Sequence, residues 1–317
     1  MLLFGIYPGS GVSDYSGPGA FFGPPDDKEK ISDALSRLQA PGKPFLIRCY
    51  TGFDNKFFTP EGVEKFLSEG RKLDIAICYR SVKYEKEAWF DFIRDLIKRY
   101  GPSIYSLQIT EEPNNPDAST GGDGGSDKVI NALVDGVVEA KRYALENGFD
   151  FLVGFNAVIS FNPSDQFWPT LAALLTPEFN TALDYVGLDF YPGVFRPLPP
   201  GMTLSDASKA VISHFRKNNL SKAQIPASIP LHITENGWPT SEERSCEEQV
   251  RSVMELIESV HSISAEYNIK CYEYFDLRDA NSLTPGFRHG LMNDDYTPKP
   301  AFGTFRDIIS RYTTDSF

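Results

Sequence analysis

The stretch Leu231-His232-Ile233-Thr234-Glu235-Asn236-Gly237-Trp238-Pro239 changes from a buried strand into a polar turn. Leu231, Ile233 and the β-branched Thr234 favour a pleated, buried segment. The following Asn-Gly pair is typical of a turn, so Glu235 stands where the strand ends. An acid at the tip of an apolar strand is poorly placed for packing and well placed to face a ligand. The stretch therefore predicts a strand whose carboxyl end carries a functional carboxylate.

Short apolar strands alternate with amphipathic helices along the chain on both sides of this stretch. Trp89, Ile93 and Leu96, for example, recur at helical spacing, which predicts a face packed against the core. The expected strands cover 2–7, 45–50, 73–79, 103–110, 151–155, 184–191, 231–235 and 270–277. The expected helices cover 27–38, 60–68, 84–100, 128–147, 165–175, 205–218, 242–267 and 300–312.

Eight strands, each followed by a helix, predict an α/β protein with a single (β/α)8 TIM barrel as one domain over residues 1–317. A doubly wound sheet is the alternative. It is disfavoured because no glycine-rich phosphate loop follows the first strand. The loops after the first, fourth and sixth strands (8–25, 116–127 and 197–201) are expected to shape the choice of ligand.

Composition excludes several classes of partner. The 317 residues carry a net charge of −12 with no basic stripe, which argues against a nucleic acid. No apolar run is long enough to span a membrane. The four cysteines have no metal-ligand spacing and suit buried free thiols, which favours the cytoplasm, with secretion after signal removal as the alternative. The oligomeric state stays open. Aromatic residues make up 13% of the chain, and some of them suit a flat, amphipathic ligand such as a sugar.

The carboxyl ends of the strands form the active face of such a barrel. Glu112 and Glu235 lie at two of these ends, and Arg48, Asn156 and Tyr191 lie at three others. Two carboxyl groups facing each other are what glycoside hydrolysis requires, because one attacks the sugar while the other supplies a proton. Arg48 near Glu235 would favour its ionised form, and the Tyr191 hydroxyl would orient it.

Residues 233–239 resemble the strand-seven nucleophile motif of the clan A glycoside hydrolases, which are retaining barrels. Gln108-Ile109-Thr110-Glu111-Glu112-Pro113-Asn114 resembles their strand-four motif, usually written Asn-Glu-Pro. Residues 274–279, 289–291 and 297–301 are similar to their eighth-strand region and last helix. The resemblance implies that Glu235 is the nucleophile and Glu112 the acid/base, and that neither a metal ion nor an organic cofactor takes part.

Two positions depart from that motif. Glu111 replaces the family's Asn, which normally holds the 2-hydroxyl of the substrate. Glu111 is then expected to accept that hydrogen bond, to raise the pKa of Glu112, or to mark an unusual sugar; acting as the acid/base itself is a further alternative. Phe275 stands where many relatives carry a Trp under the sugar ring, and a smaller ring can still stack. Trp238 is expected to form a wall of the sugar site.

The sequence therefore predicts a retaining glycosidase that cleaves a β-linked saccharide or glycoside through a covalent intermediate, with its two carboxyl groups about 5–5.5 Å apart. A transglycosylase using the same glutamates and a catalytically silent saccharide-binding barrel are the alternatives. A metal-dependent hydrolase is disfavoured, because the four His residues show no ligand spacing. Sugar identity, linkage and the choice between internal and terminal cleavage are not encoded in recognisable motifs.

Overall fold

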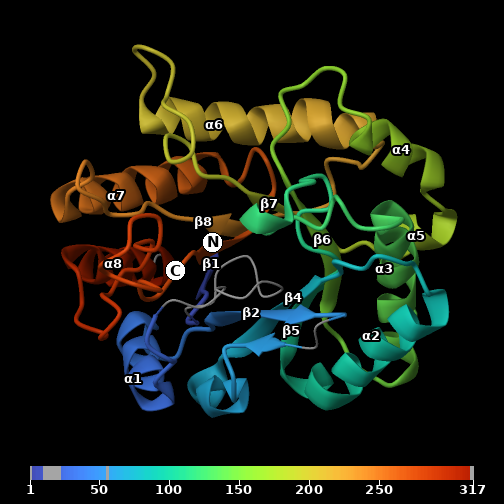
Figure 1. Ribbon diagram of the computed structural model, residues 1–317, viewed down its shortest axis with the longest axis horizontal. Coiled ribbons are helices and arrows are strands. Elements are labelled where there is room, and N and C mark those ends of the chain that lie inside the picture. Colours follow the sequence, from blue (N-terminus) through green and yellow to red (C-terminus); the bar gives the residue numbers. More distant parts are fainter. Residues whose placement is uncertain (1, 10–22, 55–56, 315–317) are drawn as a thin grey trace.

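The strands of the protein form a closed cylinder. The computed structural model describes residues 2–9, 23–54 and 57–314, so residues 10–22 of the loop expected after the first strand lie outside the described residues. Within these ranges, eight parallel strands pair in the order β1-β9-β8-β7-β6-β5-β4-β2, and β1 pairs with β2 to close the barrel (Figure 1). The strands are β1 (Leu3–Ile6), β2 (Leu46–Gly52), β4 (Lys72–Cys78), β5 (Ile104–Gln108), β6 (Leu152–Val158), β7 (Tyr185–Asp189), β8 (Leu231–Asn236) and β9 (Ile269–Tyr274).

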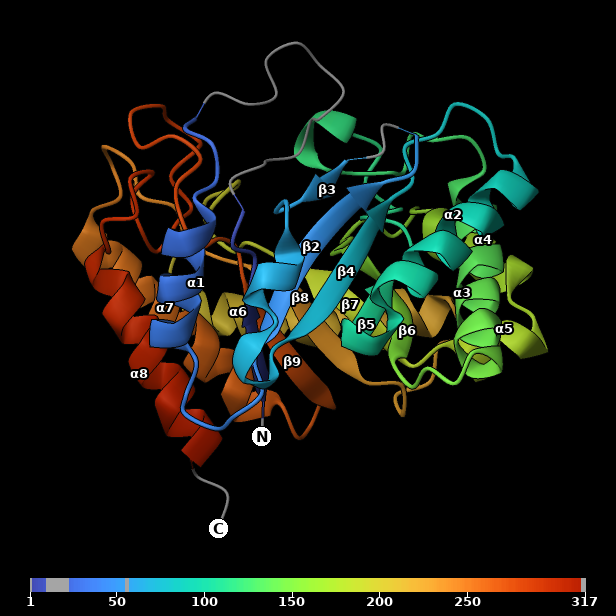
Figure 2. The ribbon, with the colours of Figure 1, turned by 90° about the horizontal axis from the view of Figure 1, so that it is seen from below.

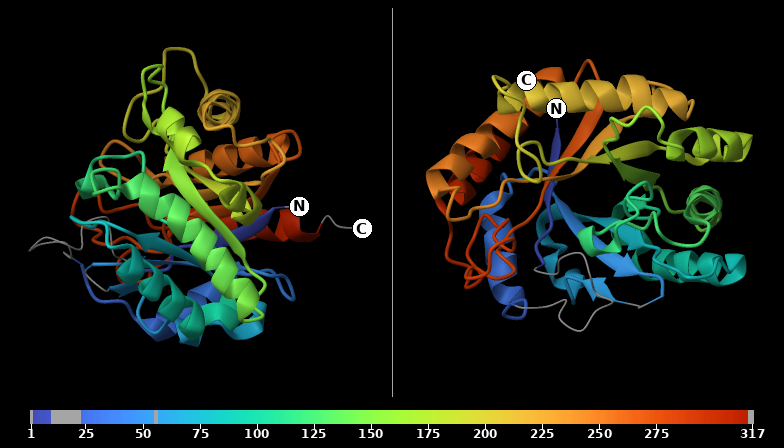
Figure 3. Two further views of the ribbon diagram at one scale, coloured as in Figure 1. Left: turned by 90° about the vertical axis from the view of Figure 1, so that its right-hand side faces the viewer. Right: turned by 45° about the horizontal axis from the view of Figure 1, so that its top comes forward.

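Helices surround this cylinder as a second layer, which Figure 3 shows from two directions. They are α1 (Lys28–Leu38), α2 (Lys86–Tyr100), α3 (Val129–Glu146), α4 (Phe167–Leu174), α5 (Pro177–Ala182), α6 (Leu204–His214), α7 (Cys246–Ile263) and α8 (Pro300–Thr314). Side chains that accept backbone N–H groups fix several helix starts. Asp27 accepts from Glu29 and Lys30 before α1, and Ser245 accepts from Glu248 before α7. The expected (β/α)8 barrel is confirmed.

Three local expectations differ from the structure. The expected helix over 60–68 is wrong, because that segment contains only a 3₁₀ turn at Val63–Phe66. Left-handed backbone at Gly62 (φ 67°) and Glu69 (φ 61°) interrupts the chain on either side of the turn, so an α-helix cannot extend through it. The short antiparallel strand β3 (Phe58–Thr59) and the six-residue helix α5 were not expected.

The hydrophobic core lies between the strands and the helices. Outward-facing residues such as Ile75, Leu107 and Ile233 are fully buried there against the helix layer. Trp89 belongs to the same core, and its indole N–H donates to the carbonyl of Ala132 at 2.9 Å. Its expected packing role is confirmed. No helix of the described residues is both long and apolar enough to cross a membrane.

Polar side chains fill the inside of the barrel, because residues alternate between its two faces along each strand. Arg48, Asp74, Gln108, Asn156 and Asp189 all point inward and contact one another there. A glycine at position 187 makes room for them: a Cβ atom there would lie 2.5 Å from the Thr234 hydroxyl and 2.8 Å from the Asn156 Cβ. In Figure 2 the arrowheads of β2 and β4 point to the same end of the barrel.

Candidate active site

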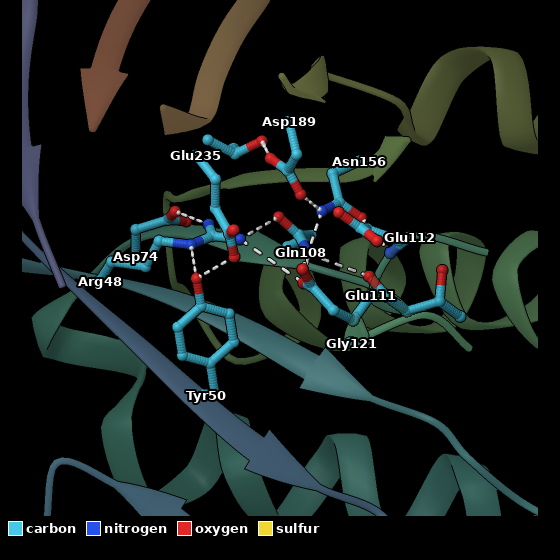
Figure 4. Close-up of polar contacts among 12 residues, drawn as sticks. Arg48, Tyr50, Asp74, Gln108, Glu111, Glu112, Gly121, Asn156, Asp189 and Glu235 are labelled. Carbon is cyan, nitrogen blue, oxygen red and sulfur yellow. Dashed lines mark hydrogen bonds and ion pairs between the residues drawn. The ribbon is translucent and has the colours of Figure 1, made fainter. Parts of the chain in front are cut away.

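Glu235 lies near the end of β8 and is held by two tyrosines (Figure 4 shows the first of them). The Tyr50 hydroxyl donates to its Oε1, and the Tyr191 hydroxyl donates to its Oε2 at 2.8 Å. Tyr50 comes from β2 and Tyr191 follows β7, so three separate parts of the barrel meet at this carboxylate. Each oxygen has one O–H donor, and the two contacts fix the plane of the group. The expected orienting contact from Tyr191 is present.

Arg48 reaches Glu235 through Tyr50 rather than directly. Its Nε donates to the Tyr50 oxygen at 2.7 Å, and Tyr50 in turn donates to Glu235. Its other nitrogens donate to Asp74 Oδ2 at 2.7 Å and to Gln108 Oε1 at 3.0 Å. The guanidinium is almost completely buried. A buried charge requires partners, and Arg48 therefore acts as the electrostatic centre of the barrel interior.

Asp74 and Glu273 share this cation at mid-barrel depth. Burial would raise the pKa of Asp74, but the Arg48 guanidinium and hydrogen bonds with Glu273 and Ser106 outweigh it and hold that pKa below its usual value. The pKa of Glu273 is raised well above its usual value by burial and by the neighbouring Asp74 carboxylate. Asp74 is thus the charged member of the pair, and Glu273 carries the proton between them.

Glu111 points into the same network and accepts from donors on both oxygens. Gln108 and Asn156 donate to it, the latter at 3.2 Å, and an Arg48 nitrogen lies 3.5 Å away. Glu111 and Arg48 therefore form an ion pair. Burial raises the pKa of Glu111 to about 8; Arg48 opposes this shift and Glu235 adds to it. Only 4% of the residue is exposed.

The loop after β5 supports this residue from behind. Asp123, in the loop over 116–127, is fully buried, and its Oδ2 accepts the backbone N–H groups of Tyr79 and Glu111, both at 2.7 Å. Figure 4 places Glu111 below Asn156 and beside Gln108. The loop over 116–127 thus anchors the residue that departs from the family motif, and composition alone gave no sign of that anchor.

Glu112 has a different environment, without a cation. Its backbone N–H donates to the Asn156 Oδ1 at 2.7 Å, and its Oε2 accepts from Asn115 at 2.7 Å. The backbone there is left-handed, with φ of 41°, an uncommon conformation that these contacts hold in place. Burial raises the pKa of Glu112 well above its usual value, and the neighbouring Glu235 and Glu111 raise it further. Glu112 therefore binds its proton more tightly than an exposed glutamate does.

Asn156 and Asp189 connect these glutamates. The Asn156 amide donates to Asp189 as well as to Glu111, and Thr234 donates to Asp189 at 2.5 Å. Asn156 is completely buried, and its hydrogen bonds position Glu111 and Asp189. Its direct contact with a ligand stays a prediction. Burial, together with nearby Glu235 and Glu111, raises the pKa of Asp189.

A third carboxyl group, that of Asp189, joins the expected Glu111 and Glu235. Glu111, Asp189 and Glu235 each bring an oxygen to within 4.8 Å of the other two. Such a trio has the donor type that suits a hard cation, and the sequence gave no indication of it. All three already accept hydrogen bonds from neighbouring side chains. The crowding itself is the main electrostatic property of the site, because it disfavours simultaneous ionisation of the three groups.

Aromatic rings surround the accessible side of Glu235. The Phe275 ring stacks on Tyr7 at a centroid distance of 5.4 Å, and His289 lies edge-on to both Phe275 and Tyr191 at 6.0 Å. The exposed Phe195 lies 5.4 Å from Tyr191. Phe275 thus belongs to a group of aromatic rings that includes Tyr191, a partner of Glu235, and its stacking on a sugar stays a prediction.

Trp238 lies beneath this rim rather than in it. Only 7% of the residue is exposed, and it packs with Leu204, Leu256 and Leu198. The guanidinium of Arg244 lies 5.2 Å from the centre of its ring. Trp238 supports the loop after β7, and its contact with a sugar stays a prediction.

Sequence reasoning missed Tyr50, Gln108 and the carboxylates Asp74 and Asp189 as parts of the site. Tyr50 is two residues after Arg48 on the same strand, so strand alternation places both on the inner face. Asp74 and Glu273 interrupt otherwise apolar strands, which marks an inward-facing polar position. Their partners come from other strands, and no local pattern encodes that pairing.

The fold is a closed (β/α)8 barrel with carboxyl groups gathered inside it near the strand ends. No family model matches the sequence, and no curated protein matches it significantly. Solved structures match over nearly the whole chain. The GH1 β-glucosidase from Exiguobacterium antarcticum B7 has a TM-score of 0.66 and 13% identity, covering 99% of this chain and 98% of that one. The family 1 β-glucosidase from Thermotoga maritima has a TM-score of 0.63 and 12% identity, and the match covers 97% of this chain and 97% of that one.

A β-glucuronidase from Bifidobacterium dentium, complexed with coumarin-3-O-glucuronide, is also similar, with a TM-score of 0.62 and 17% identity. The match covers 98% of this chain and 46% of that one. At these identities the likeness concerns the fold. The resemblance to the clan A barrels that the motifs indicated is thereby confirmed at the level of architecture.

Proposed function

We propose that the protein is a retaining β-glycosidase in which Glu235 is the nucleophile and Glu112 is the acid/base. The observation that carries this proposal is the contrast between the two groups. Glu235 accepts an O–H donor on each oxygen, which favours an ionised, oriented carboxylate. Glu112 is buried without a cation and has a raised pKa, which favours a protonated acid. Retaining hydrolysis requires this division of roles.

The first half of the reaction forms a glycosyl ester. An oxygen of Glu235 attacks the anomeric carbon, and the bond from that carbon to the leaving oxygen breaks. Glu112 transfers its proton to the leaving oxygen, so the aglycone departs as a neutral alcohol. Tyr50 and Tyr191 keep the attacking carboxylate in one plane while its charge moves into the new bond.

The second half restores the enzyme. Glu112, now ionised, accepts a proton from a water molecule whose oxygen attacks the anomeric carbon from the opposite side. The ester bond breaks and Glu235 regains its charge. Two displacements give a product with the configuration of the substrate.

Glu112 suits the acid role better than Glu111 does. Every side chain that contacts the Glu111 carboxyl group is a donor, namely Gln108, Asn156 and Arg48, so it serves as an acceptor. The Glu112 carboxyl group accepts from Asn115 and has no cation beside it. Glu112→Ala is therefore expected to cleave an activated 2,4-dinitrophenyl glycoside almost normally and an alkyl glycoside very slowly. The same profile in Glu111→Ala would transfer the acid role to Glu111.

The experiment that tests the function follows a panel of aryl β-glycosides by proton NMR. The first anomer released is expected to be β. An α-anomer as first product would mean inversion and would refute the proposal. Binding without turnover, even of dinitrophenyl glycosides, would identify a silent saccharide-binding barrel. Addition of sugar or alcohol acceptors measures the transglycosylase alternative as the ratio of transfer to hydrolysis.

A further inference from the structure

The carboxyl groups around Glu235 greatly outnumber the cations. Glu111, Glu112 and Asp189 are its acidic neighbours, and two of them lie within 4.8 Å of it. Among the described residues, Arg48 is the one cation in contact with this network. His232 also faces the barrel interior, but burial lowers its pKa to about 4, so it is neutral. Burial and crowding raise the pKa of Glu111, Glu112 and Asp189, so the site retains protons that a bound cation would displace. A positively charged group is therefore the partner that these carboxyl groups lack.

Arg48 cannot supply the missing charge for the whole site. Its shortest ion pair, 2.7 Å, is with Asp74, deeper in the barrel, whereas its nitrogen lies 3.5 Å from Glu111. The remaining Glu111 lone pairs and the Asp189 and Glu235 oxygens stay close together without a cation between them. A bound group that brings its own positive charge would remove this repulsion.

The geometry of glycoside cleavage says which part of a sugar meets these groups. When Glu235 attacks the anomeric carbon, a carboxylate within 4.8 Å of the attacking group reaches only the substituents on the adjacent ring atoms. The ring oxygen on one side has no hydrogen to donate. The substituent on carbon 2, on the other side, can donate. Glu111, whose own contacts all make it an acceptor, therefore faces the carbon-2 substituent.

We propose that this substituent is a protonated amine, so that the protein acts on β-linked 2-amino-2-deoxy glycosides. This inference rests on the proposed glycosidase function and narrows its substrate class. A 2-ammonium group donates three hydrogens and brings the charge that the site lacks, whereas a 2-hydroxyl brings one hydrogen and no charge. An N-acetyl group removes the charge and places a carbonyl oxygen next to carboxylates, so N-acetylated sugars are excluded.

The expected preference follows from the size of a hydrogen bond between charged groups. Such a bond corresponds to a ratio of about ten to a hundred between amine and hydroxyl substrates in kcat/KM. The ratio compares two substrates on one enzyme. A loss of stability or of active fraction lowers both values equally and leaves the ratio unchanged.

The experiment measures kcat/KM of the full chain at pH 6 for 4-nitrophenyl β-glycosides that differ only at carbon 2, in the gluco and galacto series. The amine is expected to exceed the hydroxyl by tenfold or more, and the N-acetyl compound to be inert. D-Glucosamine or D-galactosamine is likewise expected to inhibit more strongly than the parent hexose. This inhibition assay uses the unaltered protein and does not depend on a variant that folds.

Variants then locate the preference. Glu111→Gln keeps the shape and removes the carboxyl group that would release its proton to pair with a bound ammonium group, so the ratio is expected to fall at least tenfold. Glu273→Gln is the matched control, because Glu273 is also buried and lies 3.5 Å from Arg48 but is not part of the trio. It is expected to leave the ratio within about twofold of the wild type.

The outcomes separate this inference from the proposed function. Turnover with retention but an equal or better rate on the hydroxyl substrate would refute the amine and leave the glycosidase intact. Saturable binding of Ca²⁺ or Zn²⁺ that competes with substrate, without an amine preference, would assign the trio to a metal ion and refute the amine. Failure to turn over every glycoside would refute both.

Discussion

The two faces of the barrel wall follow opposite rules. On the outer face, side chains such as Ile75, Leu107 and Ile233 pack against helices in an apolar layer. On the inner face, Arg48 and Asp74 belong to a charged network that is equally buried. Both faces come from the same strands, because successive residues of a strand point alternately outward and inward. The outer face determines that the chain folds as a barrel, and the inner face determines what chemistry the barrel supports.

The difference also concerns how replaceable a residue is. An apolar contact is non-directional, so a neighbour of similar volume can substitute for it. A buried charge depends on particular partners, and loss of one leaves the others unpaired. Variants on the inner face should therefore show coupling between distant strands, whereas variants on the outer face should not.

The largest effect is expected for Glu235→Gln on the inner face. Loss of the attacking carboxylate should lower kcat on an aryl glycoside by on the order of 10⁴-fold or more, with little change in the free energy of unfolding. Steady-state kinetics and chemical denaturation measure the two quantities. Glu266→Gln, in an exposed turn before β9, is the control and should retain wild-type activity. Wild-type rates in Glu235→Gln would remove the nucleophile assignment.

Arg48→Met should have the largest effect on stability. It leaves Asp74 buried without its cation, which should cost about 3–5 kcal/mol in the free energy of unfolding. Asp74→Asn in the same chain should restore part of that loss. Ile75→Ala, on the outer face of β4, should cost about 2–5 kcal/mol through a cavity, and Asp74→Asn should not restore it. If Asp74→Asn changed the free energy of unfolding equally in the Arg48→Met and Ile75→Ala variants, the two faces would not differ in this respect.

His232 should make stability depend on pH. Its pKa is lowered to about 4 in the folded state, whereas an unfolded His has a pKa of about 6.5. Between these values the unfolded chain binds a proton that the folded chain does not, so stability falls as pH falls, by up to about 1.4 kcal/mol per pH unit. His232→Phe should remove this contribution from the curve between pH 6.5 and 4.

A matched variant checks that result. Tyr185→Phe keeps the ring that stacks on His232 at 4.1 Å and should keep the wild-type slope. Identical slopes in wild type and His232→Phe would mean that His232 binds its proton with the same affinity in the folded and unfolded states.

The smallest effect is expected at Tyr50. Tyr50→Phe removes the hydroxyl between Arg48 and Glu235 but keeps the ring, so kcat should fall about ten- to a hundredfold. Tyr191→Phe removes the other donor and should act similarly. An unchanged kcat in both variants would mean that the two hydroxyl groups do not assist Glu235 and that the tyrosines only pack the site.

The sequence was sufficient for the outer face and much of the site's composition. Apolar periodicity located all eight barrel strands, because burial against helices imposes a local pattern. It failed over residues 60–68, where left-handed backbone at Gly62 and Glu69 prevents an α-helix despite a helix-like composition.

The inner face was predicted only where a motif marked it. Glu112 and Glu235 were found because each ends a strand in a recognisable context. Tyr50 and Asp74 were missed because their meaning depends on Arg48 and on partners from other strands. Asp123 was missed for the same reason, since it supports Glu111 from a loop of unremarkable composition.

The central claim is the division of roles between Glu235 and Glu112, and azide rescue tests it most directly. With Glu235→Ala, azide replaces the nucleophile in a single displacement, so proton NMR should show an α-glycosyl azide from a β-glycoside. With Glu112→Ala, azide intercepts the glycosyl ester and should give the β-glycosyl azide. A β-product from Glu235→Ala, or full activity of that variant without azide, would contradict the assignment.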